Sequence, residues 1–186
     1  KHMVENHTTQ GEVNVDLIIS ARWLYPIVPS NVLLENHAVV IQAGVIIAIC
    51  PIADSQHYQA AETILLGEHV LIPGLINLHT HAAMSLMRGL ADDVPLMPWL
   101  EQHIWPAEHA VVSQSFVRDG TLLACAEMLS GGITTFNDMY FYPLAAAEAV
   151  VQMGMRANLG LVVLEFSTNY ANDAEDYIDK GTSAKD

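Results

Sequence analysis

The chain has 186 residues, of which 52% are hydrophobic, so it is long enough and apolar enough to bury a core. Acidic residues outnumber basic residues by 21 to 7, which gives a formal net charge of −14. Because a phosphate backbone or an anionic membrane is bound through clustered Lys and Arg, the composition argues against both partners and favours a small-molecule ligand.

The first residues, the longest apolar run and the two cysteines indicate where in the cell the protein is expected. Residues 1–11 are mostly polar and lack the apolar centre of a signal peptide, so we expect a disordered tail or residues introduced by cloning. The apolar run Ala43–Ala53 contains Gly and Pro and is too short to cross a bilayer. Cys50 and Cys125 lie far apart inside apolar segments, which favours two buried thiols over a disulfide. These features predict a cytoplasmic protein.

Residues 12–72 predict a small β domain that resembles a sandwich and is present only in part. Short runs of Val, Ile and Leu alternate there with turn residues, a pattern typical of strands. The tripeptide Gln42-Ala43-Gly44 predicts a tight turn that joins two strands into a hairpin. The expected strands are 16–20, 38–41, 45–49, 62–66 and 70–72.

Residues 73–186 change to strands that alternate with helices, a pattern typical of a parallel sheet with right-handed crossovers. Ser113 is expected to cap a helix that ends at Gly131-Gly132. Pro143 is expected to begin a second helix, which Gly154 ends. The expected strands are 75–81, 133–136 and 159–165, followed by a loop or frayed helix over 171–186.

The strongest chemical signal is His79-Thr80-His81 at the end of an apolar strand. Successive side chains of a strand point to opposite faces, so the two imidazoles share one face. Imidazoles are common zinc ligands, and parallel βα architectures bind ligands at the C-terminal ends of their strands. The alternative is two unrelated polar residues at a strand end. The preceding Ile72-Pro73-Gly74, which turns the chain sharply into a buried strand, favours the metal pair.

These residues resemble a known family, the amidohydrolase superfamily, and within its aminohydrolase branch the 5′-methylthioadenosine/S-adenosylhomocysteine deaminases. The resemblance covers residues 12 to about 180. It implies an α/β fold, namely the N-terminal part of a (βα)8 TIM-type barrel that follows the small β domain. The barrel is incomplete here, because a whole one takes about 250 residues. The segments that carry the resemblance are 72–81, 82–89, 99–100, 106–108 and 132–140.

The resemblance also implies roles for individual residues. His79 and His81 would hold one divalent metal ion, usually zinc, and Glu108 would bind the ribose hydroxyls of a nucleoside. A carboxylate can accept both hydrogen bonds of a vicinal diol, although an acidic residue at a helix start also has an ordinary structural explanation. Trp99 would line the pocket beside the purine, with core packing as the alternative.

The implied reaction is hydrolytic deamination of 5′-methylthioadenosine or S-adenosylhomocysteine to the inosine analogue and ammonia. A water molecule activated by the metal attacks C6 of the adenine, and a Glu carries the protons. That Glu, two further His ligands and an Asp are expected beyond Asp186, so residues 1–186 alone are expected to be inactive. The third expected strand offers no cation for the homocysteine carboxylate, which slightly favours methylthioadenosine. A homo-oligomer is also expected.

Two kinds of alternative stay open. Guanine deaminase, cytosine deaminase and triazine chlorohydrolase share the paired-histidine strand, but their substrates have no ribose diol for Glu108 to hold. A hydantoinase or dihydroorotase would need a carboxylated lysine on a later strand. The other kind is an inactive fragment that acts only as a structural module. Exposed apolar strand faces would indicate that a barrel is incomplete.

Overall fold

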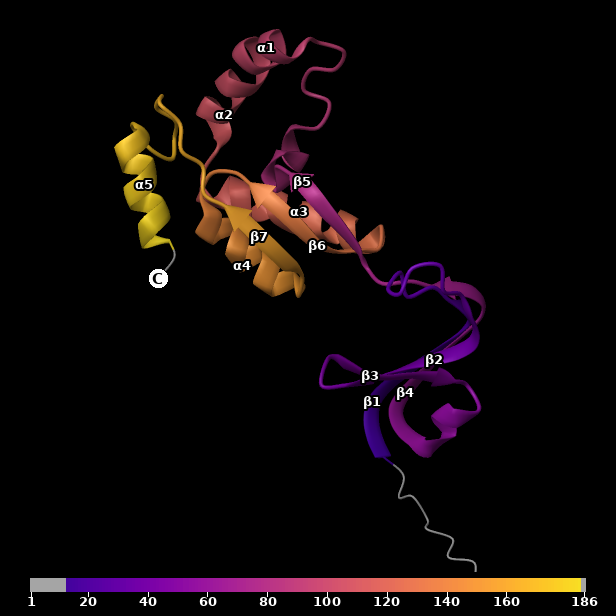
Figure 1. Ribbon diagram of the computed structural model, residues 1–186. Helices are drawn as coiled ribbons and strands as arrows, with labels where there is room; N and C mark the ends of the chain where they lie inside the picture. The colour runs from indigo at the N-terminus through magenta and orange to yellow at the C-terminus, as the bar shows by residue number, and fades with distance from the viewer. Residues whose placement is uncertain (1–12, 185–186) are drawn as a thin grey trace, which may run out of the picture. The chain divides into compact units, whose positions relative to one another are not determined.

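The computed structural model describes residues 13–184 and divides into two compact units, residues 1–73 and 74–186 (Figure 1). The tail expected over residues 1–11 lies outside the described residues. Each unit has its own sheet, so the two are described separately.

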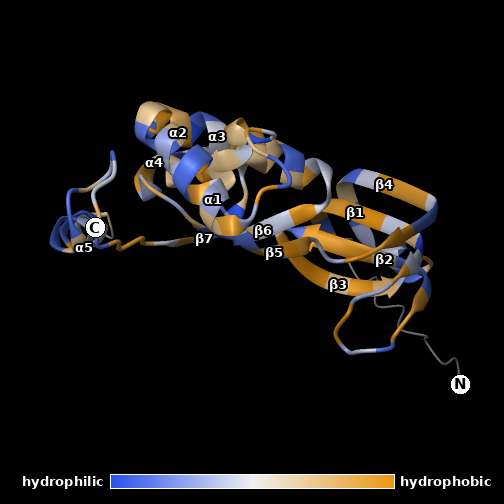
Figure 2. Ribbon diagram, turned by 90° about the horizontal axis from the view of Figure 1, so that it is seen from above, coloured by the Kyte–Doolittle hydropathy of each residue, from blue (hydrophilic) through white to orange (hydrophobic). Residues whose placement is uncertain are grey.

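The described part of unit 1 is one four-stranded sheet in the order β3-β2-β1-β4. The expected hairpin between β2 and β3 is confirmed, because Ala43 and Gly44 both have positive φ, as a two-residue hairpin turn requires. Figure 2 shows how apolar residues run along these strands. The strands are β1 (Val13–Leu24), β2 (Leu34–Gln42), β3 (Val45–Pro51) and β4 (Tyr58–Leu71), with a 3-10 helix η1 (Asp54–His57) before β4.

The prediction of two separate strands at 62–66 and 70–72 is wrong, since residues 62–66 and 70–71 belong to the single strand β4, which ends before residue 72. β4 pairs in parallel with β1 up to Leu66 and again at Val70 and Leu71, with residues 67–69 unpaired between these two stretches. The register shifts between Ala21 and Trp23 of β1. An irregularity of this kind accommodates extra residues in one strand of a pair. Residues 67–69, which were predicted to separate two strands, are such extra residues, so β4 continues through them.

Unit 2 contains the expected parallel sheet, in the order β5-β6-β7. Its strands are β5 (Leu75–Thr80), β6 (Ile133–Met139) and β7 (Arg156–Gly160). The prediction of a strand at 159–165 is wrong, because β7 begins directly after the turn at Gly154 and ends at Gly160. Gly160 pairs with Met139, the last residue of β6, so the sheet offers no partner to any later residue.

Three helices of unit 2 begin as their capping residues dictate. The Ser113 hydroxyl accepts a hydrogen bond of 3.2 Å from the Phe116 amide at the start of α3 (Gln114–Ser130), as expected. α4 (Pro143–Met153) begins at its proline and ends at Gly154, whose φ is +66°, also as expected. The segment expected to be a loop or frayed helix contains the ordered helix α5 (Ala174–Ser183), which the Asp173 carboxylate caps.

The segment between β5 and α3 is helical in several short pieces. α1, η3 and α2 follow one another without a break, and η3 has the wider π geometry. Pro106 lies just after it, and a proline removes a backbone donor and clashes with the preceding turn, which explains the widening. The pieces are η2 (Ala82–Met87), α1 (Leu96–Trp99), η3 (Leu100–Ile104) and α2 (Trp105–Val111).

Unit 2 has a buried core on one side and exposed apolar side chains on another. Cys125 and Phe136 lie in a core formed by α3, α4 and β6, and burial raises the pKa of the Cys125 thiol to about 11. Both cysteines are free, as expected, but only Cys125 is buried, whereas Cys50 is partly exposed. In contrast, Leu75, Ile76 and Leu78 of β5 are 51%, 63% and 75% exposed, the exposure expected of an incomplete barrel.

No helix in the described range 13–184 is long and apolar enough to cross a membrane.

Gly120 allows α3 to lie against η2. A Cβ atom at this position would collide with the backbone of Ala83, which is itself fully buried. We expect Gly120→Ala to lower the free energy of unfolding by about 1–3 kcal/mol, because backbone cannot retreat as a flexible side chain does. The change is measured by urea unfolding followed by circular dichroism. Gly131→Ala, at the end of the same helix, is the control, since its Cβ would make only ordinary contacts. Equal stabilities of the two variants would contradict this packing argument.

Candidate functional site

The structure brings the two predicted metal ligands together at the end of β5. The ring centroids of His79 and His81 lie 5.4 Å apart, with the ring planes at 87°. Nδ1 of His81 lies 2.7 Å from the carbonyl oxygen of Met139. A carbonyl can only accept a hydrogen bond, so Nδ1 carries the proton and the lone pair of Nε2 is available. This is the tautomer that a metal-binding histidine needs.

The donor set fits part of a metal site. Zinc usually takes four ligands, and two imidazoles supply half of them. Within residues 13–184, no cluster of three or more His, Cys, Asp or Glu side chains could hold a metal ion. Among the described residues, the predicted ligands are therefore a pair and do not form a full coordination shell.

Asp138 fixes the turn that carries His81. Its carboxylate is 2% exposed, accepts a 2.8 Å hydrogen bond from the Ala82 amide, and lies 3.0 Å from the Thr80 hydroxyl. Burial raises the pKa of Asp138, while these hydrogen bonds oppose the rise. The hydroxyl and amide donors lie on either side of His81 in sequence, so one buried group holds the backbone on both sides of the imidazole.

Glu108, the predicted ribose ligand, lies in α2 and is held toward this pair by Tyr140. The Tyr140 hydroxyl donates a 2.7 Å hydrogen bond to Glu108 Oε1, and the Tyr140 ring lies 6.4 Å from that of His81. Burial raises the pKa of Glu108, and the hydrogen bond from Tyr140 opposes the rise in part. Burial likewise raises the pKa of Tyr140, so this hydroxyl stays protonated and remains a donor.

Asn169 anchors the helix that carries Glu108. Its Nδ2 lies 3.3, 2.8 and 3.0 Å from the carbonyl oxygens of Glu108, His109 and Val112, which end α2. The Glu108 carbonyl already accepts a hydrogen bond of 2.9 Å from the Val112 amide, whereas the last carbonyls of a helix lack such partners, and the two hydrogens of an amide side chain can serve those of His109 and Val112. No local sequence pattern indicates this role, because Asn169 lies on a loop that only the tertiary structure brings to α2.

Glu108 also lines a cavity of about 130 Å³. The rings of Trp105 and Phe166 form one wall, 5.5 Å apart and tilted by 54°. Trp99, the predicted aromatic of the site, lines a separate hollow with Ile104. Trp105 could have been predicted as a wall residue from the sequence, because it lies three residues before Glu108 and residues at this spacing share a helix face. No comparable spacing in the sequence relates Phe166 to Glu108.

The buried carboxylate of Asp138 yields a test of this arrangement. Asp138→Ala leaves the buried Ala82 amide unpaired, so we expect a loss of about 1–3 kcal/mol in the free energy of unfolding. Asp138→Asn keeps one acceptor oxygen and should lose less. Thermal and urea unfolding of both variants measure the difference. An alanine variant as stable as the original would show that the hydrogen bonds do not hold the turn.

Comparison with known proteins gives the family. Residues 70–185 match the sequence profile of the Amidohydrolase family. A 5-methylthioadenosine/S-adenosylhomocysteine deaminase of Saccharophagus degradans is 54% identical over 92% of this chain and 39% of its own length. A 5′-deoxyadenosine deaminase of Methanosarcina barkeri is 42% identical over 87% of this chain and 37% of its own length.

Solved structures agree with this assignment. An adenosine deaminase from Xanthomonas campestris with bound zinc is 45% identical, with a TM-score of 0.90 over 92% of this chain and 39% of that one. A guanine deaminase of E. coli, 19% identical with a TM-score of 0.69, shares the fold over 88% of this chain and 43% of its own. The chain thus spans about 39% of the length of the first curated relatives it matches. It belongs to the amidohydrolase family.

Proposed function

We propose that this chain supplies the N-terminal part of a metal-dependent deaminase of adenosine-type nucleosides, with 5′-methylthioadenosine as the first substrate to test. The observation that carries the proposal is the link from His81 through Tyr140 to Glu108. It joins a metal-binding imidazole to a carboxylate suited to a ribose diol. The names of the two curated relatives described above, a 5-methylthioadenosine/S-adenosylhomocysteine deaminase and a 5′-deoxyadenosine deaminase, support it.

The finer structural assignments belong to the same proposal. Residues 12–72 are assigned to a partial, sandwich-like β domain, and residues 73–186 to the first βα units of a TIM-type barrel. Zinc is the proposed metal, which the zinc in the Xanthomonas structure supports. A cytoplasmic location and a homo-oligomeric state stay predictions. The 186-residue chain alone is expected not to catalyse, since the described residues supply only a pair of the metal ligands.

Each residue has a separate task in the proposed mechanism. His79 and His81 would hold the metal ion, which when bound supplies Lewis-acid activation of water. Glu108 accepts the ribose hydroxyls, which places the adenine toward the histidines. Tyr140 keeps the carboxylate of Glu108 in position through its hydrogen bond. Asn169 holds the helix that presents Glu108.

The tests use the long form, defined as a polypeptide that continues this chain to the length of its curated relatives. We expect His79→Ala or His81→Ala to weaken zinc binding by about tenfold or more, because each removes a nitrogen ligand. Equilibrium dialysis followed by elemental analysis measures the affinity. His57→Ala, at an exposed histidine of η1, is the matched control. Unchanged zinc binding in both strand variants would refute the metal site.

The ribose contact is tested with paired substrates. The long form should convert 5′-methylthioadenosine to its inosine analogue, which is followed by ultraviolet absorbance. Glu108→Gln should raise KM for this nucleoside by about tenfold, because a charged hydrogen bond is lost. A 2′,3′-dideoxy analogue lacks the diol, so its KM should not change.

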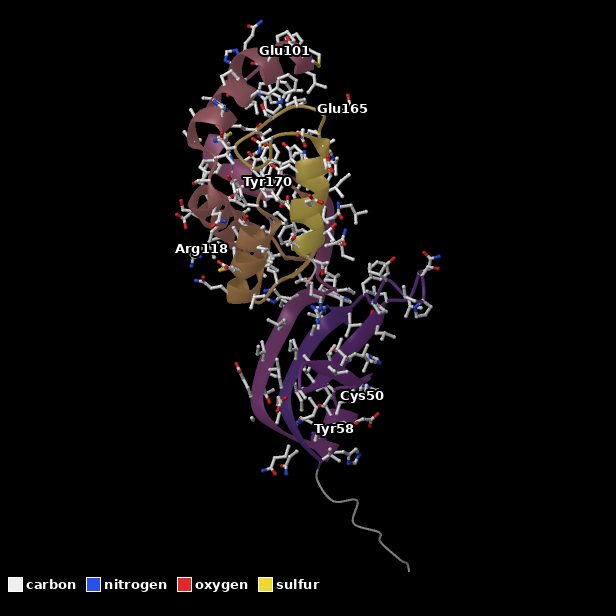
Figure 3. All side chains as sticks on the ribbon, turned by 90° about the vertical axis from the view of Figure 1, so that its left-hand side faces the viewer. Cys50, Tyr58, Glu101, Arg118, Glu165 and Tyr170 are labelled. Carbon is white, nitrogen blue, oxygen red and sulfur yellow. The ribbon has the colours of Figure 1, made fainter. Side chains whose placement is uncertain are left out.

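Glu101→Gln provides the control for Glu108, since it makes the same change on the adjoining η3. Glu101 is exposed and is labelled in Figure 3. If both variants behave alike, or if Glu108→Gln affects the diol and dideoxy substrates equally, Glu108 does not bind ribose. Absence of deamination by the zinc-loaded long form would reject the proposed function itself.

A further inference from the structure

The strand that carries the two proposed metal ligands is irregular at His79. Between two pairs of the β5–β6 ladder, β5 has two residues, Leu78 and His79, whereas β6 has one, Asn137. The flanking pairs are Asn77 with Phe136 and Thr80 with Asp138. This is the count of a β-bulge, in which an extra residue bends the strand, redirects a side chain and disrupts the regular ladder. The direction of the His79 side chain therefore depends on contacts other than the regular ladder.

Two asparagine side chains hold the peptide group that joins Leu78 to His79. Nδ2 of Asn137 donates a hydrogen bond of 3.3 Å to the carbonyl oxygen of Leu78. The backbone N–H of His79 donates one of 3.2 Å to Oδ1 of Asn77. In a trans peptide the carbonyl oxygen and the N–H point in opposite directions, so this planar group is held from both sides. Its orientation in turn sets the direction in which the His79 side chain leaves the backbone.

Asn158 of β7 determines which way the Asn137 amide faces. The two residues are paired across β6 and β7, two strands that lie side by side in the sheet (Figure 1). Nδ2 of Asn158 donates a hydrogen bond of 2.6 Å to Oδ1 of Asn137. An amide side chain accepts through its oxygen and donates through its nitrogen. A donor on Asn158 therefore attracts the Asn137 oxygen and leaves the Asn137 nitrogen to face the Leu78 carbonyl, which can only accept.

From this chain of contacts we propose that Asn137 and Asn158 are positioning residues for the metal ligand His79, with Asn158 acting through Asn137. The inference rests on the proposed function, since it concerns the metal site of that function. Zinc binds an imidazole nitrogen at about 2.0–2.1 Å, so a ligand on a bulge must be held in one direction to meet the ion. His81 is held differently, because its own ring contacts the Met139 carbonyl.

The first test is the zinc affinity of the long form, measured by equilibrium dialysis. Asn137→Leu replaces the amide by an apolar group of similar size and should weaken zinc binding by about tenfold, because a group that orients a metal ligand is lost. Asn158→Leu should weaken it too, by no more than Asn137→Leu. The double variant should bind zinc as Asn137→Leu does, since Asn158 acts only through Asn137. Gln59→Leu, the same kind of change at an exposed position of β4, is the control.

A second readout separates positioning from general stability. With cobalt(II) in place of zinc, the visible absorption of Asn158→Leu should differ from that of the unaltered long form, because an imidazole in the coordination shell has moved. Thermal unfolding of the metal-free variants measures their stability. A loss of stability with unchanged zinc affinity and an unchanged cobalt spectrum would overturn the inference and leave the asparagines a structural role only.

The outcomes also separate this inference from the proposed function. If His79→Ala weakens zinc binding while both asparagine variants bind zinc normally, the inference is wrong and the metal site stands. If His79→Ala and His81→Ala both leave zinc binding unchanged, the metal site on which the inference rests is wrong. Additive losses from the two asparagine changes would show that Asn158 does not act through Asn137. Alanine variants at the two positions replace any leucine variant that does not fold.

Discussion

The pairing of β5 with β6 is the constraint on which the candidate site depends. Parallel register brings the end of β6 beside the residues that follow β5, so the carbonyl of Met139 meets the ring of His81. The same register buries Asp138 against the turn that holds that ring. The ring nitrogen of His81 that carries the proton is thus determined by a backbone carbonyl of the neighbouring strand, and a carboxylate of the same strand holds the turn that carries the ring.

Sequence reasoning succeeded where local signals agree with the fold. The Ser113 cap, the Pro143 helix start and the hairpin turn at Ala43-Gly44 each depend on residues close in the chain. The alternation of side chains along a strand likewise placed His79 and His81 on one face. These features follow from backbone geometry, which the residues themselves determine.

The errors arose where distant pairing decides the outcome. β4 runs through a polar stretch because β1 pairs with it on both sides, and β7 stops at Gly160 because β6 has ended. The wall of the cavity was missed for a similar reason. Trp105 had a usable signal in its spacing from Glu108, but Phe166 and Asn169 come from a loop that only tertiary structure brings to α2.

The role of Asn169 also bears on the order in which the molecule is assembled. It lies 61 residues after Glu108, yet its amide donates to the carbonyls of His109 and Val112 at the end of the helix that carries Glu108. A nascent chain can pair β5 with β6 before Asn169 has been synthesised, whereas α2 cannot acquire this cap until later. Contacts of such sequence separation close slowly because a long loop must first be ordered. The histidine pair can therefore form before this cap exists, while the helix that carries Glu108 gains it only after Asn169 has been synthesised.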